Sequence, residues 1–470
     1  MPTPPVSAPA ADVTVVDGRK TWRVGTLVYT APGLVGLFCW LTFGDFAWSM
    51  RDRSVMPMAQ WYLNHLNVPN VLFGLLLTSF PALLGILIGP VISVKSDRHR
   101  GRWGRRIPFL LVTTPLAAFG MIALGLTPLF AKWVHGHFPR QDEMVVSVVC
   151  FGFSWAAFEF ATIAGGAVFG GLVNDVVPKP MLGRFYGLFR AISLIDGMIF
   201  NYWIVGHVPG HFTLILCVVG VFYGCAFTWV CLKVKEGGYP PPPPPATTAE
   251  GTAPARGLRT VFAETRRYCR ECFTHSYYLS IFALLQIAVL AFNPINTFAI
   301  PYARSLGVDM TVYGKYLALT YMISLSLSFF LGWLADVFHP LRIAIASLAC
   351  YIVVTAFGSL YATTAQTFLI AWVAHGVLSG CYYTSAASLG QRLFPHSRFA
   401  QFMSAAGIFI ALANMTIAPV MGLVIDRTGG IYRHTFSVAC GLAVVALAAG
   451  LHVHRRFMKL GGPTGYVAPE

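Results

Sequence analysis

Charged residues are what this sequence has least of: Asp, Glu, Lys and Arg make up 11% of its 470 residues, against roughly 25% in soluble domains. Hydrophobic residues make up 56% of the chain, and its mean hydropathy is +0.65. A chain with this balance is typical of proteins whose surface faces lipid. The composition therefore predicts an integral membrane protein.

Sequence motifs for nucleotide, metal and covalent chemistry are also missing. No G-x-x-x-x-G-K-[ST] pattern occurs, which excludes an ATP-driven pump built on that loop. The ten cysteines are scattered, and the C-x-x-C pair of Cys269 and Cys272 stands alone, so we expect no metal site and no cofactor. Residues 1–18 lack the order of a signal peptide, and we expect no cleavage there. We expect a protein that is not an enzyme.

Long apolar runs are what the sequence has in quantity. About 20 mostly apolar residues suffice for a helix to cross a bilayer. Twelve such runs occur, at about 27–50, 71–92, 108–130, 144–173, 177–205 (with its lead-in), 212–232, 278–301, 313–335, 343–363, 368–389, 402–425 and 435–451. They predict an all-α polytopic membrane protein with twelve transmembrane helices.

The net charge of +15 raises the question of a nucleic-acid partner, and the placement of the cations answers it. Most of the 33 Lys and Arg lie in the tails and in the even-numbered loops between the runs. This is the positive-inside bias of membrane proteins. We therefore expect no nucleic acid, both termini in the cytoplasm, and an inner or plasma membrane location. The exceptions, in odd-numbered loops, are Arg51, Arg53, Lys132, Arg140, Arg304, Lys315, Arg427 and Arg433.

A proline-rich stretch divides the runs into two sets of six. Residues 240–245 are all proline, which cannot continue a helix and is typical of a stiff spacer. We expect the following domains: a cytoplasmic tail at 1–24, a six-helix bundle at 25–234, a cytoplasmic linker at 235–275, a second six-helix bundle at 276–456 and a tail at 457–470.

The two halves are similar in sequence at corresponding loops. Residues 178–185 align without gaps with residues 395–402, each between the fourth and fifth helices of its half. Asp97, after the second helix, corresponds to Asp336, after the eighth. Two matches at corresponding loops indicate an internal repeat, as in many transporters.

The loop at residues 93–108 carries six cations and one acid, in the order Ser96-Asp97-Arg98-x-x-x-Arg102-Trp103-Gly104-Arg105-Arg106-x-Pro108. With twelve helices in two halves, it resembles the major facilitator superfamily over about residues 25–456. More narrowly, the loop resembles the glycoside–pentoside–hexuronide cation symporters and the sucrose–proton symporters. The sequence departs from the family pattern in Ser93, which stands where a Gly is usual, and in the second copy after Asp336, which lacks the Arg-Arg pair.

The resemblance implies the major facilitator fold, two pseudo-symmetric bundles that rock around a central site, with this loop as the cytoplasmic gate. We expect Asp97 to face the N-terminal end of the eleventh helix, where a carboxylate is worth roughly 0.3–1 kcal/mol, and to pair with Arg98 or Arg102. The alternative for the cations is that they only set orientation. The gate candidates are Asp97, Arg98, Arg102, Arg105, Arg106, Arg184, Asp336 and Arg342.

Three acids lie inside the expected membrane helices: Asp45, Glu159 and Asp196. An ionisable group in the hydrocarbon costs about 2.5–3.5 kcal/mol on insertion scales unless it faces protein or water. Each is therefore a candidate to carry a coupling proton or sodium ion. Asp45 is expected near the outer end of the first helix, where an outer-gate salt bridge is an equal alternative.

Aromatic, amide and imidazole groups inside the runs are candidates for binding a polar substrate. They are Trp48, Gln286, Asn293, Asn296, His375, Tyr382 and Asn414. The alternative, favoured for any one of them alone, is that they hydrogen-bond helices to each other.

The sequence thus predicts a secondary active transporter that works by alternating access, and the resemblance implies cation-coupled, most simply proton-coupled, uptake of a sugar or glycoside. An antiporter or exporter, or a carrier of amphiphilic, lipid-like molecules, is the alternative. A transporter-like sensor is less favoured because the tails and linker are short and of low complexity. The expected partners are a small-molecule substrate and the lipid bilayer, with the protein a monomer.

Overall fold

The computed structural model describes residues 13–16, 19–239, 266, 270, 272–395 and 399–469. Side chains of residues 13–16, 19, 329, 336, 399, 400, 404 and 464 are not described. The expected proline-rich spacer, Cys269 of the C-x-x-C pair and part of the 395–402 loop therefore lie outside the described residues, whereas Cys272 is described and is buried.

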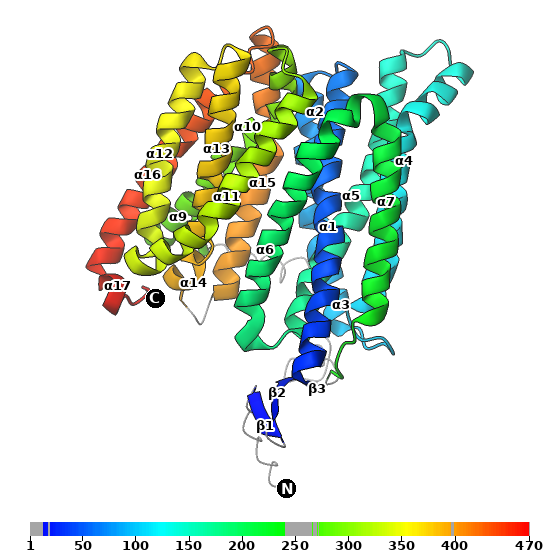
Figure 1. The fold of residues 1–470 in the computed structure, drawn as a ribbon. Coiled ribbons are helices and arrows are strands. Elements are labelled where there is room, and N and C mark those ends of the chain that lie inside the picture. Colours follow the sequence, from blue (N-terminus) through cyan, green and yellow to red (C-terminus); the bar gives the residue numbers. More distant parts are fainter. Residues whose placement is uncertain are drawn as a thin grey trace. The chain divides into compact units, whose positions relative to one another are not determined.

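Helices form nearly all of the described chain (Figure 1). The first half contains α1 (Ala31–His65), a continuous run of α2 (Asn70–Gly74), η1 (Leu75–Ser79) and α3 (Phe80–Arg98), then α4 (Ile107–His137) and α5 (Glu143–Val176). It ends with η2 (Lys179–Met181), α6 (Leu182–Ile199), η3 (Phe200–Ile204), η4 (Val205–His207) and α7 (Val208–Lys233).

The second half begins with a continuous run of α9 (Ser276–Phe282), η5 (Ala283–Ile287) and α10 (Ala288–Ser305). It continues with α11 (Met310–Phe338), α12 (Pro340–Tyr361), α13 (Ala365–Ala386), α14 (Leu389–Leu393), α15 (Phe399–Arg427), α16 (His434–Lys459) and α17 (Gly462–Gly465). Each of the twelve apolar runs coincides with one helix or one continuous series of helices. The expected all-α polytopic fold is therefore confirmed.

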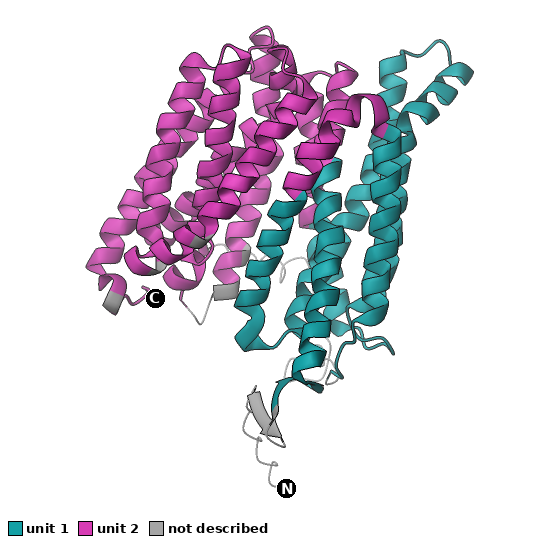
Figure 2. Ribbon diagram, in the orientation of Figure 1, with its two compact units in different colours: residues 1–55, 87–196, 213–243 teal, residues 56–86, 197–212, 244–470 magenta. Residues whose placement is uncertain are grey.

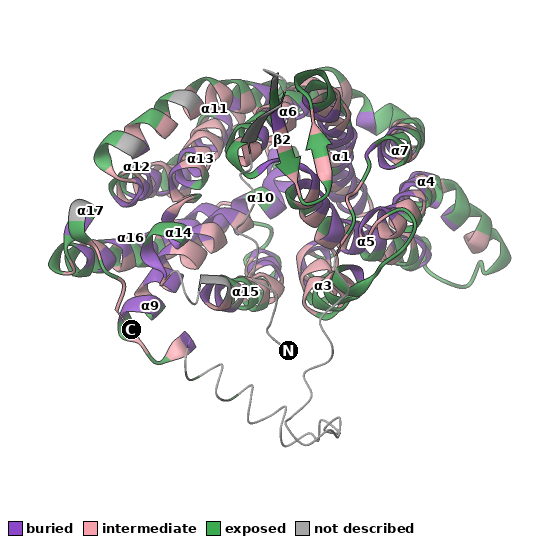
Figure 3. Ribbon diagram, turned by 90° about the horizontal axis from the view of Figure 1, so that it is seen from below, coloured by how far each residue is buried: buried purple, intermediate pink, exposed green. Residues whose placement is uncertain are grey.

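Membrane character is visible in both length and exposure. Within the described ranges, nine helices or helix runs are long and apolar enough to cross a membrane. Large apolar side chains are exposed along α4, such as Phe119 at 68%, and along α7, such as Leu214 at 59% (Figure 3). Because such side chains are stable in contact with lipid and not with water, these faces are the ones that a bilayer would cover.

A small sheet precedes the first helix, where the sequence predicted only a tail. It consists of β1 (Val13–Val16), β2 (Arg19–Val24) and β3 (Leu27–Tyr29) in the order β1-β2-β3, both pairs antiparallel. These short segments are rich in Val, Thr, Trp and Tyr, the β-branched and aromatic residues that suit strands. The first membrane helix begins at Ala31 and not at about residue 27 as expected, because residues 27–29 form β3.

The predicted end of the first helix, at Met50, is wrong: α1 continues to His65. The charged triplet at residues 51–53 suggested a loop, but its members lie inside the helix. Asp45 is therefore about 21 Å from the start of α1 and about 30 Å from its end, at 1.5 Å per residue. It lies near the middle of the helix and not at its outer rim.

By internal packing the chain divides into two compact units (Figure 2). Unit 1 comprises residues 1–55, 87–196 and 213–243, and unit 2 comprises residues 56–86, 197–212 and 244–470. Unit 2 thus contains the six helix runs of the second half and also one end each of α1, of the α2–α3 run and of the α6–η4 run. The domain boundaries expected from the sequence stay a prediction.

We call the Asn70 end of the α2–α3 run, within unit 2, the distal end. There α2 packs against α15 at two glycines. A Cβ on Gly422 would lie 2.2 Å from the carbonyl oxygen of Asn70, and one on Gly74 would lie 2.7 Å from the backbone of Ala418. Ser79 donates a hydrogen bond of 2.5 Å to the carbonyl of Met415 in the same contact. Small residues let the two backbones meet directly.

This packing predicts that Gly422→Ala lowers thermal stability. The added methyl meets backbone that cannot rotate away, and overpacking of this kind costs about 1–3 kcal/mol. The matched control is Gly407→Ala in the same helix, because a Cβ there meets nothing within 4 Å. We expect the control to be neutral or slightly stabilising. Melting temperatures of the purified variants measure the difference, and equal melting temperatures would contradict the close contact.

Candidate functional site

A network of ion pairs in unit 1 joins the loop after α3 to α5. Arg105 binds Asp175 through both nitrogens of one edge, Nη2 to Oδ1 at 2.5 Å and Nε to Oδ2 at 2.8 Å. Arg106 reaches the same carboxylate at 3.2 Å and also pairs with Asp97 at 2.5 Å. Bidentate guanidinium–carboxylate pairs fix geometry as well as charge. Asp175 therefore anchors the Arg105–Arg106 pair to the end of α5.

Arg106 is held in place on three sides. Its Nη1 donates to the hydroxyl of Ser96 at 2.6 Å, and its side chain is 9% exposed. A Cβ on Gly171 of α5 would lie 2.7 Å from its Cζ, so the guanidinium lies directly on the helix backbone there. The absence of a side chain at residue 171 is what admits it.

Glu236, three residues before the described segment ends at residue 239, caps the start of α4. Its Oε1 accepts the N–H groups of Arg106 at 2.8 Å and Ile107 at 2.7 Å, and its Oε2 accepts the N–H of Arg105 at 3.0 Å. Tyr239 donates its hydroxyl to Oε2 at 2.8 Å and places its ring 4.3 Å from the Arg105 guanidinium. A carboxylate satisfies the unpaired N–H groups of a helix start and is stabilised by the helix dipole.

The predicted gate residues divide into three groups. Arg105, Arg106 and Asp97 come together. We had expected Asp97 to pair with Arg98 or Arg102, but its ion-pair partner is Arg106. Arg184 and Arg342 are exposed. Asp336 lies in α11, and its side chain is outside the described residues.

The second-half loop is built differently from the first. His339 adopts a positive φ of 75° and accepts the N–H of Leu341 through Nδ1, which starts α12. Burial, together with the positive charges of Arg392 and Arg342, lowers the pKa of His339 to about 4. The ring is therefore neutral at physiological pH, as a ring nitrogen must be to accept a hydrogen bond.

A buried arginine lies in the middle of α1, within unit 1. Arg51 is 1% exposed and donates to Asp52 at 2.6 Å and 3.1 Å and to the hydroxyl of Tyr223 at 3.2 Å. Its guanidinium stands 3.9 Å from the centre of the Trp48 ring. The aromatic faces and the adjacent carboxylate replace the water that this charge would otherwise need. These partners explain why α1 continues through a charged triplet.

Two carboxylates, Asp45 on α1 and Asp196 on α6, are buried in the same unit. Asp196 is 0% exposed and Asp45 is 7% exposed. Both oxygens of Asp196 and Oδ2 of Asp45 have no hydrogen-bond partner among the described residues. The charges of Asp45 and Arg53 act on Asp196, and the charge of Asp52 acts on Asp45. Arg53 itself donates to the Ser193 hydroxyl at 2.8 Å and to its carbonyl at 3.2 Å.

Glu159, the third predicted acid, is 7% exposed on α5. The positive charge of Arg51 acts on it. α1, α5 and α6 thus bring all three predicted acids into one unit. The charge of Arg51 acts on Glu159, and the charge of Arg53 acts on Asp196. Within the described residues, no three His, Cys, Asp or Glu side chains are grouped as metal ligands.

The amides predicted to bind substrate hydrogen-bond to one another in unit 2. Asn293 of α10 donates to the side chain of Asn414 of α15 at 2.9 Å and accepts from Thr297 at 2.7 Å. His375 of α13, 0% exposed, contacts the Asn296 side chain at 3.2 Å and the Tyr351 hydroxyl at 2.9 Å. Asn296 is otherwise exposed.

The remaining three substrate candidates lie apart from these amides. Trp48 is in unit 1, where its ring has Arg51 over it and stacks on Phe169 at 5.0 Å. Tyr382 donates its hydroxyl to the carbonyl of Leu284 at 2.7 Å and is otherwise buried in an apolar core. Gln286 is half-buried in η5, a π-helical segment of the kind that often occurs at functional sites.

Asp426, which the sequence reasoning missed, closes the distal end of unit 2. Its Oδ1 accepts the backbone N–H of Asn70 at 3.2 Å and the side-chain amide at 2.7 Å, and its Oδ2 accepts the N–H of Val71 at 3.1 Å. Tyr432 donates to the Asn70 side chain at 3.1 Å. A carboxylate at the end of α15 therefore caps the first turn of α2, beside the Gly74–Gly422 contact.

A signal for Asp426 is present in the sequence. The pair Asp426-Arg427 ends α15 as Asp97-Arg98 ends α3, and each helix carries its only acid at that position. Asp175 and Glu236 were also missed. They stand at helix ends without a motif, and only the folded chain shows which arginines and N–H groups they meet.

The network at Arg105 and Arg106 predicts unequal effects of two conservative substitutions. Asp175→Asn removes the charge that two arginines share in a partly buried place and should cost about 1.5–3 kcal/mol. Asp97→Asn, whose side chain is 52% exposed, should cost less than about 1 kcal/mol, leave the protein in the membrane and still slow transport. Thermal melting and transport rates of both variants separate the two roles. Equal destabilisation would contradict the assignment of Asp175 as the anchor.

Comparison with known proteins agrees with this architecture. Residues 281–463 match the family model described as Major Facilitator Superfamily. No curated relative matches the chain in sequence.

Several solved structures share the fold over most of the chain. A bacterial homologue of the human lysosomal transporter Spinster, inward-facing and unoccupied, is 15% identical, with 94% of this chain and 100% of that chain covered and a TM-score of 0.66. The nucleoside transporter NupG is 11% identical, with coverage of 89% and 98% and a TM-score of 0.62. A POT family transporter in complex with a thioalcohol-conjugated peptide is 13% identical, with coverage of 91% and 96% and a TM-score of 0.61.

At these identities the structures establish the fold, and the family match adds the sequence pattern of the second half. The chain is thus a polytopic membrane protein with the fold of these solved transporters, and its residues 281–463 carry the sequence pattern of the Major Facilitator Superfamily.

Proposed function

We propose that this chain is a cation-coupled secondary transporter in which Asp196, together with Asp45, binds the coupling proton or cation. The observation that carries the proposal is the burial of Asp196 with both carboxylate oxygens unpartnered among the described residues. A carboxylate in such surroundings is unstable as a bare anion. It is stable when it takes up a proton or a small cation, which is the property that a coupling site needs.

The position of Asp45 strengthens this assignment. Two carboxylates whose charges repel each other favour binding of one shared positive charge. Arg53 is the cation of the same region, and its hydrogen bonds to Ser193 hold it on α6. Glu159 differs because the charge of Arg51 already acts on it. We therefore assign Glu159 to balancing Arg51.

We propose that the transport cycle opens and closes the distal contact of unit 2. There Asp426 caps α2 across 356 positions of sequence, and glycines bring α2 and α15 together. Such a contact joins the first half of the chain to the second, so its release would free one end of the first half. This is the kind of change that alternating access requires.

The cargo that we propose is a sugar or glycoside, taken up with the cation. Its support is the resemblance of the 93–108 loop to sugar symporters and the exposed amide of Asn296 beside the Asn293–Asn414 pair. Amides of this kind hydrogen-bond sugar hydroxyls in both directions.

Counterflow in proteoliposomes tests the proposed function. Purified protein is reconstituted and preloaded with each member of a panel of unlabelled sugars and glycosides, and uptake of the same labelled compound is followed. We expect saturable exchange for at least one member. Protein-free liposomes are the control, and no exchange across the whole panel would overturn the proposed cargo.

The coupling site predicts a specific loss in Asp196→Asn and Asp45→Asn. An amide cannot be charged by losing a proton, so uphill accumulation should fall at least tenfold while downhill exchange of labelled substrate persists. Accumulation and exchange are measured in the same vesicles, with a proton or sodium gradient imposed.

The matched control is Glu143→Gln, an exposed acid in the first turn of α5, which should leave both activities unchanged. If both aspartate variants still concentrate substrate, the assignment is wrong and Glu159 becomes the candidate. A purely structural aspartate would instead lower accumulation, exchange and protein yield together.

The distal contact predicts that Asp426→Asn shifts the protein toward a state in which this contact is open. A carboxylate at an exposed helix start is worth about 0.3–1 kcal/mol, and Asp426 is exposed, so the open fraction should rise about twofold to fivefold. Spin labels at the exposed positions His65 and Arg427 report the distance across the contact.

The matched control is Asp142→Asn, which removes a carboxylate cap from α5 that lies wholly within the first half. It should leave the distance distribution unchanged. An unchanged distribution in Asp426→Asn itself would remove Asp426 from the gate.

A further inference from the structure

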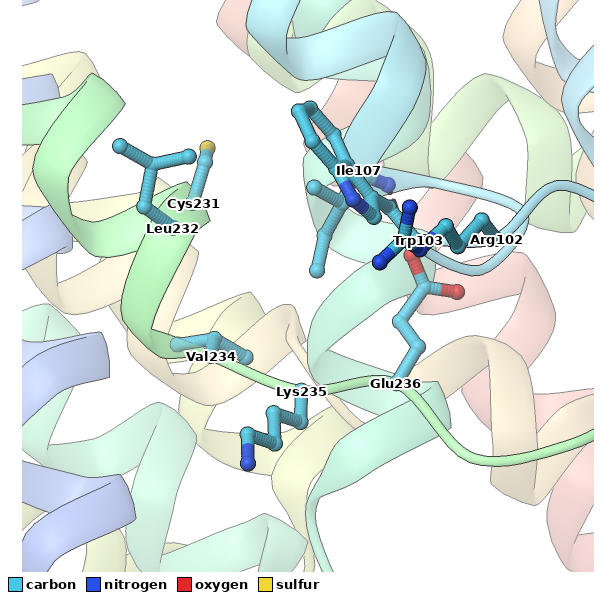
Figure 4. Close-up of a pocket in the computed structure, with 8 residues that line it drawn as sticks. All are labelled: Arg102, Trp103, Ile107, Cys231, Leu232, Val234, Lys235 and Glu236. Atoms are coloured by element: carbon cyan, nitrogen blue, oxygen red, sulfur yellow. Dashed lines mark hydrogen bonds between the residues drawn. The ribbon is translucent and has the colours of Figure 1, made fainter.

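A pocket of about 450 Å³ lies in unit 1 between the start of α4 and the end of α7. Its volume falls within the range of roughly 300–1,000 Å³ that is usual for ligand sites. Figure 4 shows its two walls, the loop and first turn of α4 on one side and the last turn of α7 with the following segment on the other. The lining residues are Arg102, Trp103, Ile107, Cys231, Leu232, Val234, Lys235 and Glu236.

Next to the pocket, α4 and α7 pack closely at glycines of α7. A Cβ on Gly224 would lie 2.8 Å from the Ala118 side chain, and one on Gly220 would lie 3.2 Å from Met121. These contacts hold α7 against α4 along the middle of their length. At their ends, the chain enters α4 from a loop that Glu236 fastens to the segment after α7, which leaves an opening between them.

The free charge of this pocket is positive. Glu236, the one acid in its lining, uses both oxygens for three backbone N–H groups and the Tyr239 hydroxyl. Arg102 and Lys235 are exposed and form no ion pair or hydrogen bond with the residues that the structure describes. Arg102 and Lys235 come from opposite walls, and in Figure 4 the Lys235 ammonium points away from Arg102, so a shared anionic ligand requires rotation of the exposed lysine side chain. The lining holds no free carboxylate that would repel such a ligand.

The rest of the lining is apolar and continues onto a lipid-facing surface. Trp103 is 55% exposed and Leu232 is 59% exposed, although both border the pocket. Trp229, one turn before Lys233 on α7, is also 55% exposed, with the Lys233 ammonium 5.6 Å from its ring centre. Exposed Trp beside Lys and Arg marks the level of the membrane interface. The pocket is thus open at the depth of phospholipid headgroups.

We propose that this pocket binds an anionic phospholipid, with the phosphate held by Arg102 and Lys235 and the glycerol and first acyl carbons against Trp103. Basic pockets between membrane helices hold such headgroups. The charge and the apolar wall together favour a lipid over a free anion, which would gain nothing from Trp103 or Leu232. The bound lipid would fasten the loop that carries Arg105 and Arg106.

Native mass spectrometry of the purified full-length protein tests the proposal. The protein is titrated with phosphatidylglycerol and, separately, with phosphatidylcholine of the same acyl chains. We expect saturable, preferential binding of phosphatidylglycerol. The double variant Arg102→Gln/Lys235→Gln should weaken it about 25-fold, at about fivefold for each cation removed. Both residues are exposed, so the variant is expected to fold.

A matched control separates the pocket from general surface charge. Lys95→Gln/Arg98→Gln removes two exposed cations of the same loop region that do not line the pocket, and it should leave phosphatidylglycerol binding within about twofold. Trp103→Ala should weaken binding without any change of charge. The proposal is overturned if the control weakens binding as much as the pocket variant does, if phosphatidylcholine binds equally well, or if millimolar inorganic phosphate displaces the lipid.

Discussion

The unpaired N–H groups at helix starts are the constraint that several of this structure's carboxylates satisfy. A helix leaves four such groups without partners, and lipid offers none. The chain has 18 acids, and several of them serve this purpose. Asp142 and Asp309 cap their own helices, α5 and α11. Glu236 and Asp426 cap α4 and α2 from 129 and 356 positions away.

The distant caps have a consequence that the local caps lack. A local cap forms as soon as its helix forms and stabilises only that helix. A cap from another part of the chain forms only when two elements are docked, so it stabilises the docked state over the undocked one. Glu236 thereby ties the segment after α7 to the loop before α4, and Asp426 ties α15 to α2. At these two places the same hydrogen bonds stabilise both the helix start and the tertiary contact.

Much of the fold could be predicted because lipid imposes a simple rule on the sequence. About 20 apolar residues make a membrane helix, and all twelve runs are helical. The rule failed at Arg51, Asp52 and Arg53, which suggested a loop. Arg51 is stable inside α1 because Trp48, Asp52 and Tyr223 surround it. Tyr223 is 172 positions away, and no local pattern indicates that it would be there.

Those residues of the candidate site that stand out individually in the sequence could be predicted. Acids inside apolar runs are rare enough to be noticed, and Asp45, Glu159 and Asp196 are all buried in unit 1. Partners are a different matter, because they depend on the approach of separate helices. No pattern in the sequence favoured Arg106 over Arg98 as the partner of Asp97, since both are close in the chain. What selects Arg106 is Asp175 and Gly171 of α5, which hold its guanidinium in place.

The two Asp-Arg pairs at the ends of α3 and α15 now differ in a way that bears on the proposed cycle. Asp426 is bound to backbone N–H groups across 356 positions, whereas Asp97 is bound to Arg106 within its own loop region. A local pair does not join the halves of the chain, and a distant one does. Suppose that alternating access closes one end of the protein while it opens the other. Asp97 would then have to leave Arg106 in order to cap another helix, and Asp426 would have to leave Asn70. In such an exchange Asp175 would keep Arg106 partnered after Asp97 had left, because Asp175 already pairs with Arg106.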